Sequence, residues 1–157
     1  IVASAPVAQR LRHASVHHDT GLSAASHAIG LAVLRDWRRF RARTQDILDA
    51  NRPIMEDWLT RMAGEGLVSG CLSPWGCLAF PGLEGMARTD GFAAWLLATR
   101  DVIVAPGHYW GAPAHIRLGF GMAQGRLVQG LAELEQALRA YATMDEPQRR
   151  AVDAFSP

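Results

Sequence analysis

The chain has 157 residues, of which 49% are hydrophobic and 20% are charged, which predicts one soluble domain with an ordinary hydrophobic core. Its 16 basic and 15 acidic residues nearly cancel, so charge does not indicate a nucleic-acid partner. No stretch approaches the roughly 18 apolar residues of a membrane span, and the first residues do not resemble a signal segment. We therefore expect a cytoplasmic protein with no membrane partner.

All 16 basic residues are arginines, and the chain contains no lysine. No carbonyl compound can therefore be held as an imine by a lysine of this chain. The two cysteines, Cys71 and Cys77, are too few for a disulfide framework, and their spacing is not that of a zinc or redox pair. We predict that both are buried thiols.

The first residues predict a short helix and a loop. Residues 1–6 are typical of a strand end that enters a turn, and because Ile1 is not a start methionine we expect the chain to belong to a larger protein. Residues 7–13 follow a helical pattern, and residues 14–22 predict a polar link. Ser23 can cap the helix that follows this link.

A long helical stripe begins after Ser23. Apolar side chains recur near the 3.6-residue period up to Met62, and Gly64 and Gly66 end the pattern. Pro53 lies inside the stripe and removes one helix hydrogen bond. The sequence therefore predicts either a kinked long helix or two helices that meet near Asn51.

Short apolar runs separated by glycine and proline predict strands in the second half. Residues 67–72 and 76–80 predict a hairpin around residues 73–76, and further strands are expected at 102–105 and 115–120. Asp90 can cap a helix that ends near residue 100, and residues 124–142 predict an amphipathic helix. The tail after residue 144 is expected to fray.

The order of these elements is helix, strand, strand, helix, strand, strand, helix, without an internal repeat. It predicts an α+β fold, in which a small, mainly antiparallel sheet has helices packed on one face and is preceded by the long interdomain helix. Strict alternation of helices and strands would have indicated a doubly wound parallel sheet instead.

One segment carries a specific resemblance. A buried strand ends at Pro106-Gly107, a Trp110-Gly111 turn follows, and the next strand carries Arg117. This series resembles the C-terminal small domain of class I/II aminotransferases, which are pyridoxal-phosphate-dependent enzymes of fold type I. In that family the strand arginine binds the substrate α-carboxylate, so the resemblance implies this role for Arg117.

The residues themselves are compatible with this role. On a strand, Arg117 points to the opposite face from Ile116 and Leu118, and its planar guanidinium can bind a carboxylate through two parallel hydrogen bonds. The alternative is an exposed or structurally paired arginine. The long helix with Asn51-Arg52 and the final helix also agree with the family in order and length, so the resemblance covers roughly residues 1–142.

The resemblance implies weaker substrate-binding candidates at four positions, which are Trp75, Gly76, Tyr109 and Thr20. Two of these regions depart from the family pattern, since Trp75 stands where the family often has glycine and the turn carries Tyr109-Trp110 where phenylalanine is frequent. Thr20 lies in the link that, in the resembling enzymes, lies near the dimer interface. These departures alter the expected lining of a substrate pocket.

The resemblance also implies pyridoxal 5'-phosphate as cofactor, an amino-acid or keto-acid substrate, and a homodimer. The family's cofactor lysine and phosphate-binding loop belong to a preceding large domain. We therefore expect no catalytic residue in this chain and no activity from it alone, and its cofactor-binding residues are unknown. The expected organisation is the end of the large domain and a link at 1–28, the small domain at 29–144, and a tail at 145–157.

Other chemistry is less favoured by the sequence. His17, His18 and Asp19 suggest a metal, but no matching distant ligand set exists because His108 and His115 belong to different elements, so no metal is expected. No dinucleotide, phosphate-loop or nucleophile-elbow motif occurs. The alternatives to an aminotransferase are a cyclase or lyase of amino-acid biosynthesis, a noncatalytic ligand-sensing or dimerisation module of an aminotransferase-like regulator, and an unrelated interaction domain.

Overall fold

The computed structural model describes residues 3–18 and 23–155 and divides the chain into two compact units, residues 1–41 and 42–157. The first unit contains α1 (Ala5–His18), α2 (Ala24–Arg35) and the start of α3 (Trp37–Gly64). Ser23 caps α2 as predicted, because its hydroxyl accepts a hydrogen bond from the Ser26 amide at 3.1 Å. The predicted link is wrong in its first part, since α1 continues to His18.

The helices of this region meet at Asp36 and not near Asn51, because α3 continues through Pro53 to Gly64. The proline costs α3 only one backbone donor. Tertiary contacts hold the same turn, since the buried Asn51 amide donates hydrogen bonds to the carbonyls of Phe120 and Met122, both at 2.7 Å. These contacts fix the helix to the end of a strand.

The second unit holds two small antiparallel sheets, which confirms the α+β fold. One pairs β1 (Val68–Ser69) with β3 (Gly82–Leu83), and the other has the order β2 (Leu78–Ala79), β5 (Ile116–Gly119), β4 (Ala105–Pro106). The predicted hairpin of residues 67–72 with 76–80 is wrong. β2 pairs with β5, with Leu78 opposite Gly119, and β1 pairs with the later β3.

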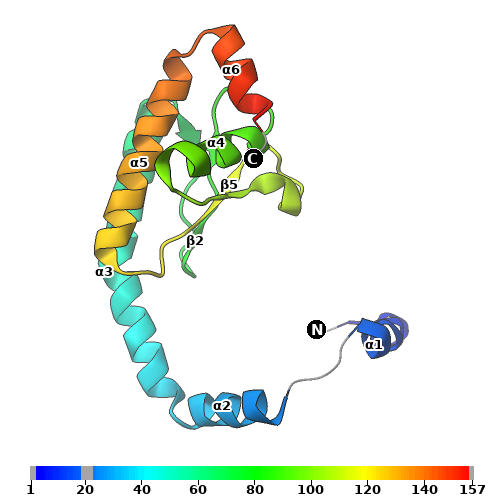
Figure 1. Ribbon diagram of the computed structural model, residues 1–157. Helices are drawn as coiled ribbons and strands as arrows, with labels where there is room; N and C mark the ends of the chain where they lie inside the picture. Colours follow the sequence, from blue (N-terminus) through cyan, green and yellow to red (C-terminus); the bar gives the residue numbers. More distant parts are fainter. Residues whose placement is uncertain (1–2, 19–22, 156–157) are drawn as a thin grey trace. The chain divides into compact units, whose positions relative to one another are not determined.

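The remaining elements are helical: α4 (Asp90–Arg100), the 3₁₀ turn η1 (Gly107–Trp110), α5 (Gln124–Thr143) and α6 (Glu146–Asp153). Figure 1 shows α5 beside the later part of α3, where Arg61 pairs with Glu135 at 3.2 Å and Arg139 pairs with Glu65 at 2.7 Å. Both helices pack on one face of the β2–β5 strands (Figure 1).

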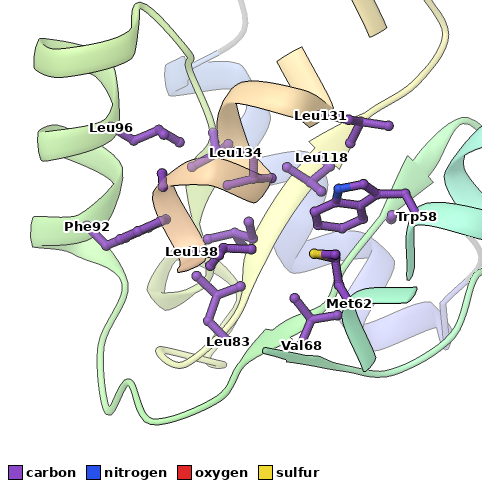
Figure 2. Close-up of a cluster of buried hydrophobic side chains, with 14 of the residues drawn as sticks. Trp58, Met62, Val68, Leu83, Phe92, Leu96, Leu118, Leu131, Leu134 and Leu138 are labelled. Atoms are coloured by element: carbon purple, nitrogen blue, oxygen red, sulfur yellow. The ribbon is translucent and has the colours of Figure 1, made fainter. Parts of the chain in front are cut away.

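One continuous hydrophobic core joins these elements. Figure 2 shows side chains from α3, α4, α5 and both sheets gathered in it, including Trp58, Met62, Val68, Leu83, Phe92, Leu96, Leu118, Leu131, Leu134 and Leu138. Cys71 and Cys77 lie outside this core and are exposed, so the prediction that both are buried thiols is wrong. Within the described ranges, no helix has the length and apolarity of a membrane span.

The tail after Met144 forms a docked helix instead of fraying. Asp145 and Gln148 cap α6 reciprocally, each side chain bonding the backbone N–H of the other. Val152 is buried, and the Tyr141 hydroxyl donates to Asp153 Oδ1 at 2.9 Å. The capped turn and these contacts explain why the segment is ordered.

The Tyr141 phenol gives this docking a measurable pH dependence. Burial, the hydrogen bond to Asp153 and the charge of that carboxylate raise the pKa of Tyr141 from 10.0 to about 12. The folded state therefore binds the phenolic proton more tightly, and its stabilising effect is complete below pH 10 and lost as pH rises to 12. We expect the free energy of unfolding to fall by about 2 kcal/mol across this window.

Urea unfolding between pH 9 and 12 tests this expectation. The chain contains no lysine, so no ammonium group titrates in the same window. Tyr141→Phe, which cannot ionise, should remove most of the decline. An equal decline in the variant and the wild type would show that Tyr141 is not its source.

Candidate functional site

The candidate site lies on the outer face of the three-stranded sheet. Ile116 and Leu118 of β5 are buried, whereas Arg117 between them is exposed on the opposite face, as the strand alternation predicts. Arg117 lies opposite Ala105 of β4, and the register of β2 with β5 brings Phe80 beside it on the other side. Arg117 is thus the central side chain of this face.

The Arg117 guanidinium lines an open hollow. Its central carbon lies 5.1 Å from the centroid of the Trp110 ring, a cation–π distance. The hollow has a volume of about 340 Å³ and is lined by Leu78, Ala79, Phe80, Trp110 and Arg117. Among the residues that the structure describes, none forms an ion pair or hydrogen bond with this guanidinium. Its planar donors are therefore available to an anion.

Backbone geometry explains why Trp110 reaches Arg117. The Gly107 N–H donates to the His115 carbonyl at 2.7 Å, which closes the loop between β4 and β5. A Cβ on Gly107 would lie 2.1 Å from the Ala112 carbonyl oxygen, so only glycine fits there. Gly111 then turns the chain with a φ of 72°. The Pro-Gly and aromatic-Gly pairs of the sequence are thus the two ends of this turn.

Trp110 and Phe80 border the hollow beside the guanidinium and contact further rings. Trp110 meets Phe80 edge to face at 6.0 Å, and Phe80 stacks on His115 at 5.0 Å. Tyr109 contacts the edge of Trp110 but is 71% exposed and does not line the hollow. The structure therefore brings Trp110 and Phe80 to Arg117 and leaves Tyr109 at the border.

The other predicted site residues lie apart from the hollow. Arg52 holds the 73–76 turn through hydrogen bonds to the carbonyls of Ser73 at 2.8 Å and Gly76 at 3.2 Å. Trp75 at the tip is 83% exposed, and neither it nor Gly76 lines the hollow. Thr20 lies outside the described residues. No group of three metal-ligating side chains occurs in the part of the chain that the structure describes.

Sequence reasoning missed two kinds of site residue. Phe80 is in the predicted strand, and alternation from the buried Ala79 would have placed it on the outer face. Asp90 was predicted only to cap a helix, but Thr89 occupies the cap position and Asp90 contacts His108. That contact joins residues 18 positions apart, so no local pattern indicates it.

This fold occurs in PLP-dependent enzymes. No protein-family model matches the chain, and no curated protein matches it in sequence. Solved structures do match, and they include aminotransferases, one of them described as PLP-dependent. The likeness confirms that the chain has the fold of the C-terminal small domain of the fold-type I aminotransferases.

Three particular structures illustrate the match. A PLP-dependent aminotransferase from Streptococcus suis is 24% identical with a TM-score of 0.71, over 92% of this chain and 38% of that one. The PLP-dependent cyclase OrfR is 24% identical with a TM-score of 0.69, over 80% of this chain and 35% of that one. Aspartate aminotransferase from Thermotoga maritima is 20% identical with a TM-score of 0.56, over 88% of this chain and 34% of that one. The chain thus spans less than two fifths of the length of each.

Proposed function

We propose that this chain is the C-terminal part of a PLP-dependent aminotransferase in which Arg117 binds the carboxylate of an amino-acid or keto-acid substrate. The observation that carries the proposal is the Arg117 guanidinium, which lies over Trp110 in an open hollow with no carboxylate partner among the described residues. A homodimer in the cytoplasm, with the site completed by a preceding domain, is part of the same proposal.

The surroundings of Arg117 suit a carboxylate. Its fork geometry matches two carboxylate oxygens, and charge-assisted bonds of this kind are roughly twice as strong as neutral ones. Leu78, Phe80 and Trp110 supply apolar surface around it. By fixing one end of the substrate, Arg117 would orient the amino-bearing carbon; it binds and orients and moves no proton.

The residues of this chain do not fit the covalent anchoring of the cofactor. The chain has no lysine, and the hollow around Arg117 has no second cation for a phosphate. The proposal therefore assigns cofactor binding to a preceding domain and expects the isolated chain to be inactive. What this chain contributes is the carboxylate end of the substrate site.

Following the substrate nitrogen tests the proposed reaction. The full-length protein, with pyridoxal phosphate, is given amino acids labelled with nitrogen-15 and an unlabelled 2-oxo acid. We expect the label to appear in the amino acid formed from the acceptor, with a 2-oxo acid formed from the donor. Mass spectrometry of both products reads out each half of the exchange.

The same experiment distinguishes the second candidate, a PLP-dependent cyclase. The likeness to OrfR favours it, because that cyclase matches this chain at the same identity as the Streptococcus suis aminotransferase. A cyclase would retain the labelled nitrogen in a rearranged product and need no acceptor. That result would replace transamination and leave the role of Arg117 unchanged.

A further inference from the structure

Two successive residues at the start of α4 hold the loop that carries Trp110. The buried Thr89 hydroxyl donates to the His115 carbonyl at 2.7 Å, and its amide donates to the Pro113 carbonyl at 2.9 Å. Asp90 Oδ1 lies 2.5 Å from His108 Nδ1. Thr89 thus binds the end of the loop and Asp90 binds its beginning, so α4 fixes both sides of Trp110.

The contact between Asp90 and His108 is close and has a neighbour on each side. Arg88 pairs with the other oxygen of the same carboxylate, Asp90 Oδ2, at 3.2 Å. Tyr109 lies against the other side of the imidazole, with ring centroids 3.9 Å apart. The His108 imidazole therefore contacts both the Asp90 carboxylate and the Tyr109 ring.

The constraint on His108 reaches Arg117 through Trp110. His108, Tyr109 and Trp110 belong to one short 3₁₀ turn, so we expect a backbone shift at His108 to displace the Trp110 ring as well. Trp110 is the only described ring with a cation–π contact to Arg117. Phe80 supports the other side of Trp110 but does not fix the turn itself.

We infer that Asp90 and His108 are positioning residues for the Arg117 site, since they set the turn whose Trp110 ring holds the guanidinium. The inference rests on the proposed function for its effect on substrate use. The expected effect on the position of the Arg117 side chain does not depend on that function. Neither residue is assigned a contact with substrate.

The experiment compares variants of the full-length protein. Asp90→Ala and His108→Ala should each raise the KM for the amino acid by about tenfold and change kcat by less than about twofold, because misplacement of a binding group acts on substrate capture. Asp90→Asn should recover most of the loss, since its side chain has the same shape and keeps an oxygen beside His108 Nδ1. The matched control is Glu133→Ala, which removes the 2.9 Å pair with Arg100 at the opposite end of α4.

A second measurement needs no substrate. The Trp110 ring current shifts the Arg117 side-chain protons, so Asp90→Ala should move their NMR signals toward those of Trp110→Ala, while Asp90→Asn and Glu133→Ala should not. Unmoved signals and an unchanged KM in Asp90→Ala would overturn the inference, as would an equal effect of Glu133→Ala. If Arg117→Ala leaves the KM unchanged, the proposed function fails, and the NMR signals still decide whether Asp90 and His108 position Arg117.

Discussion

Arg117→Ala in the full-length protein is expected to lower kcat/KM for the amino-acid substrate by about 10²- to 10⁴-fold. Two charge-assisted hydrogen bonds are lost, and each contributes roughly 1.5–3 kcal/mol. The guanidinium has no ion pair among the described residues, so its removal leaves no buried carboxylate unpaired and the fold should be unaffected. Steady-state kinetics check the loss of kcat/KM, and thermal unfolding checks that the stability is unchanged.

Arg117→Lys separates charge from geometry. A lysine keeps the positive charge but cannot form two parallel bonds, so we expect it to restore only a minor part of the loss. Arg126→Ala is the matched control, because Arg126 lies in α5 and lines other hollows of the surface. Wild-type kinetics in Arg117→Ala, or an equal loss in Arg126→Ala, would remove Arg117 from the substrate site.

Gly91→Ala is expected to destabilise the protein by about 3 kcal/mol, at the upper end of the usual cost of overpacking. A Cβ at this position in α4 would lie 2.3 Å from the backbone carbonyl oxygens of both Val152 and Asp153. Backbone atoms cannot rotate away as a side chain does, so α6 would have to shift. Thermal unfolding followed by circular dichroism should show a midpoint lower by about 10 °C.

Gly130→Ala is the matched control for that substitution. Gly130 also lies within a helix, but a Cβ there meets no atom within 4 Å. Removing a glycine from a helix interior should stabilise the protein by about 0.5–1 kcal/mol. The two alanine variants are therefore expected to shift the midpoint in opposite directions. A Gly91→Ala variant as stable as the wild type would mean that helix α4 does not need glycine for the docking of α6.

The local patterns of the sequence predicted several elements well. Ser23 caps α2, Gly64 ends α3, and the apolar period of residues 124–142 gives α5 within one residue. Alternation alone also placed Arg117 on the face opposite Ile116 and Leu118. These features depend on neighbours only a few residues away, which a sequence displays directly.

Two of the predictions that failed required a choice of distant partner. Residues 67–72 were assigned to the nearest apolar run, whereas β1 pairs with β3 and β2 pairs with β5. The tail was expected to fray, but α6 is held by the hydrogen bond from Tyr141 to Asp153 and packs closely against Gly91. The β1–β3 pairing and the docking of α6 both depend on contacts between elements that a local sequence pattern does not reveal.

The sequence by itself thus determined the α+β fold, the outward direction of Arg117 and the absence of any lysine for a covalent cofactor link. Only the tertiary structure decided that Trp110 and Phe80 border the guanidinium and that Asp90 reaches His108. The physical reason is that backbone preferences and side-chain alternation are local, whereas a site is assembled by packing between elements far apart in the chain.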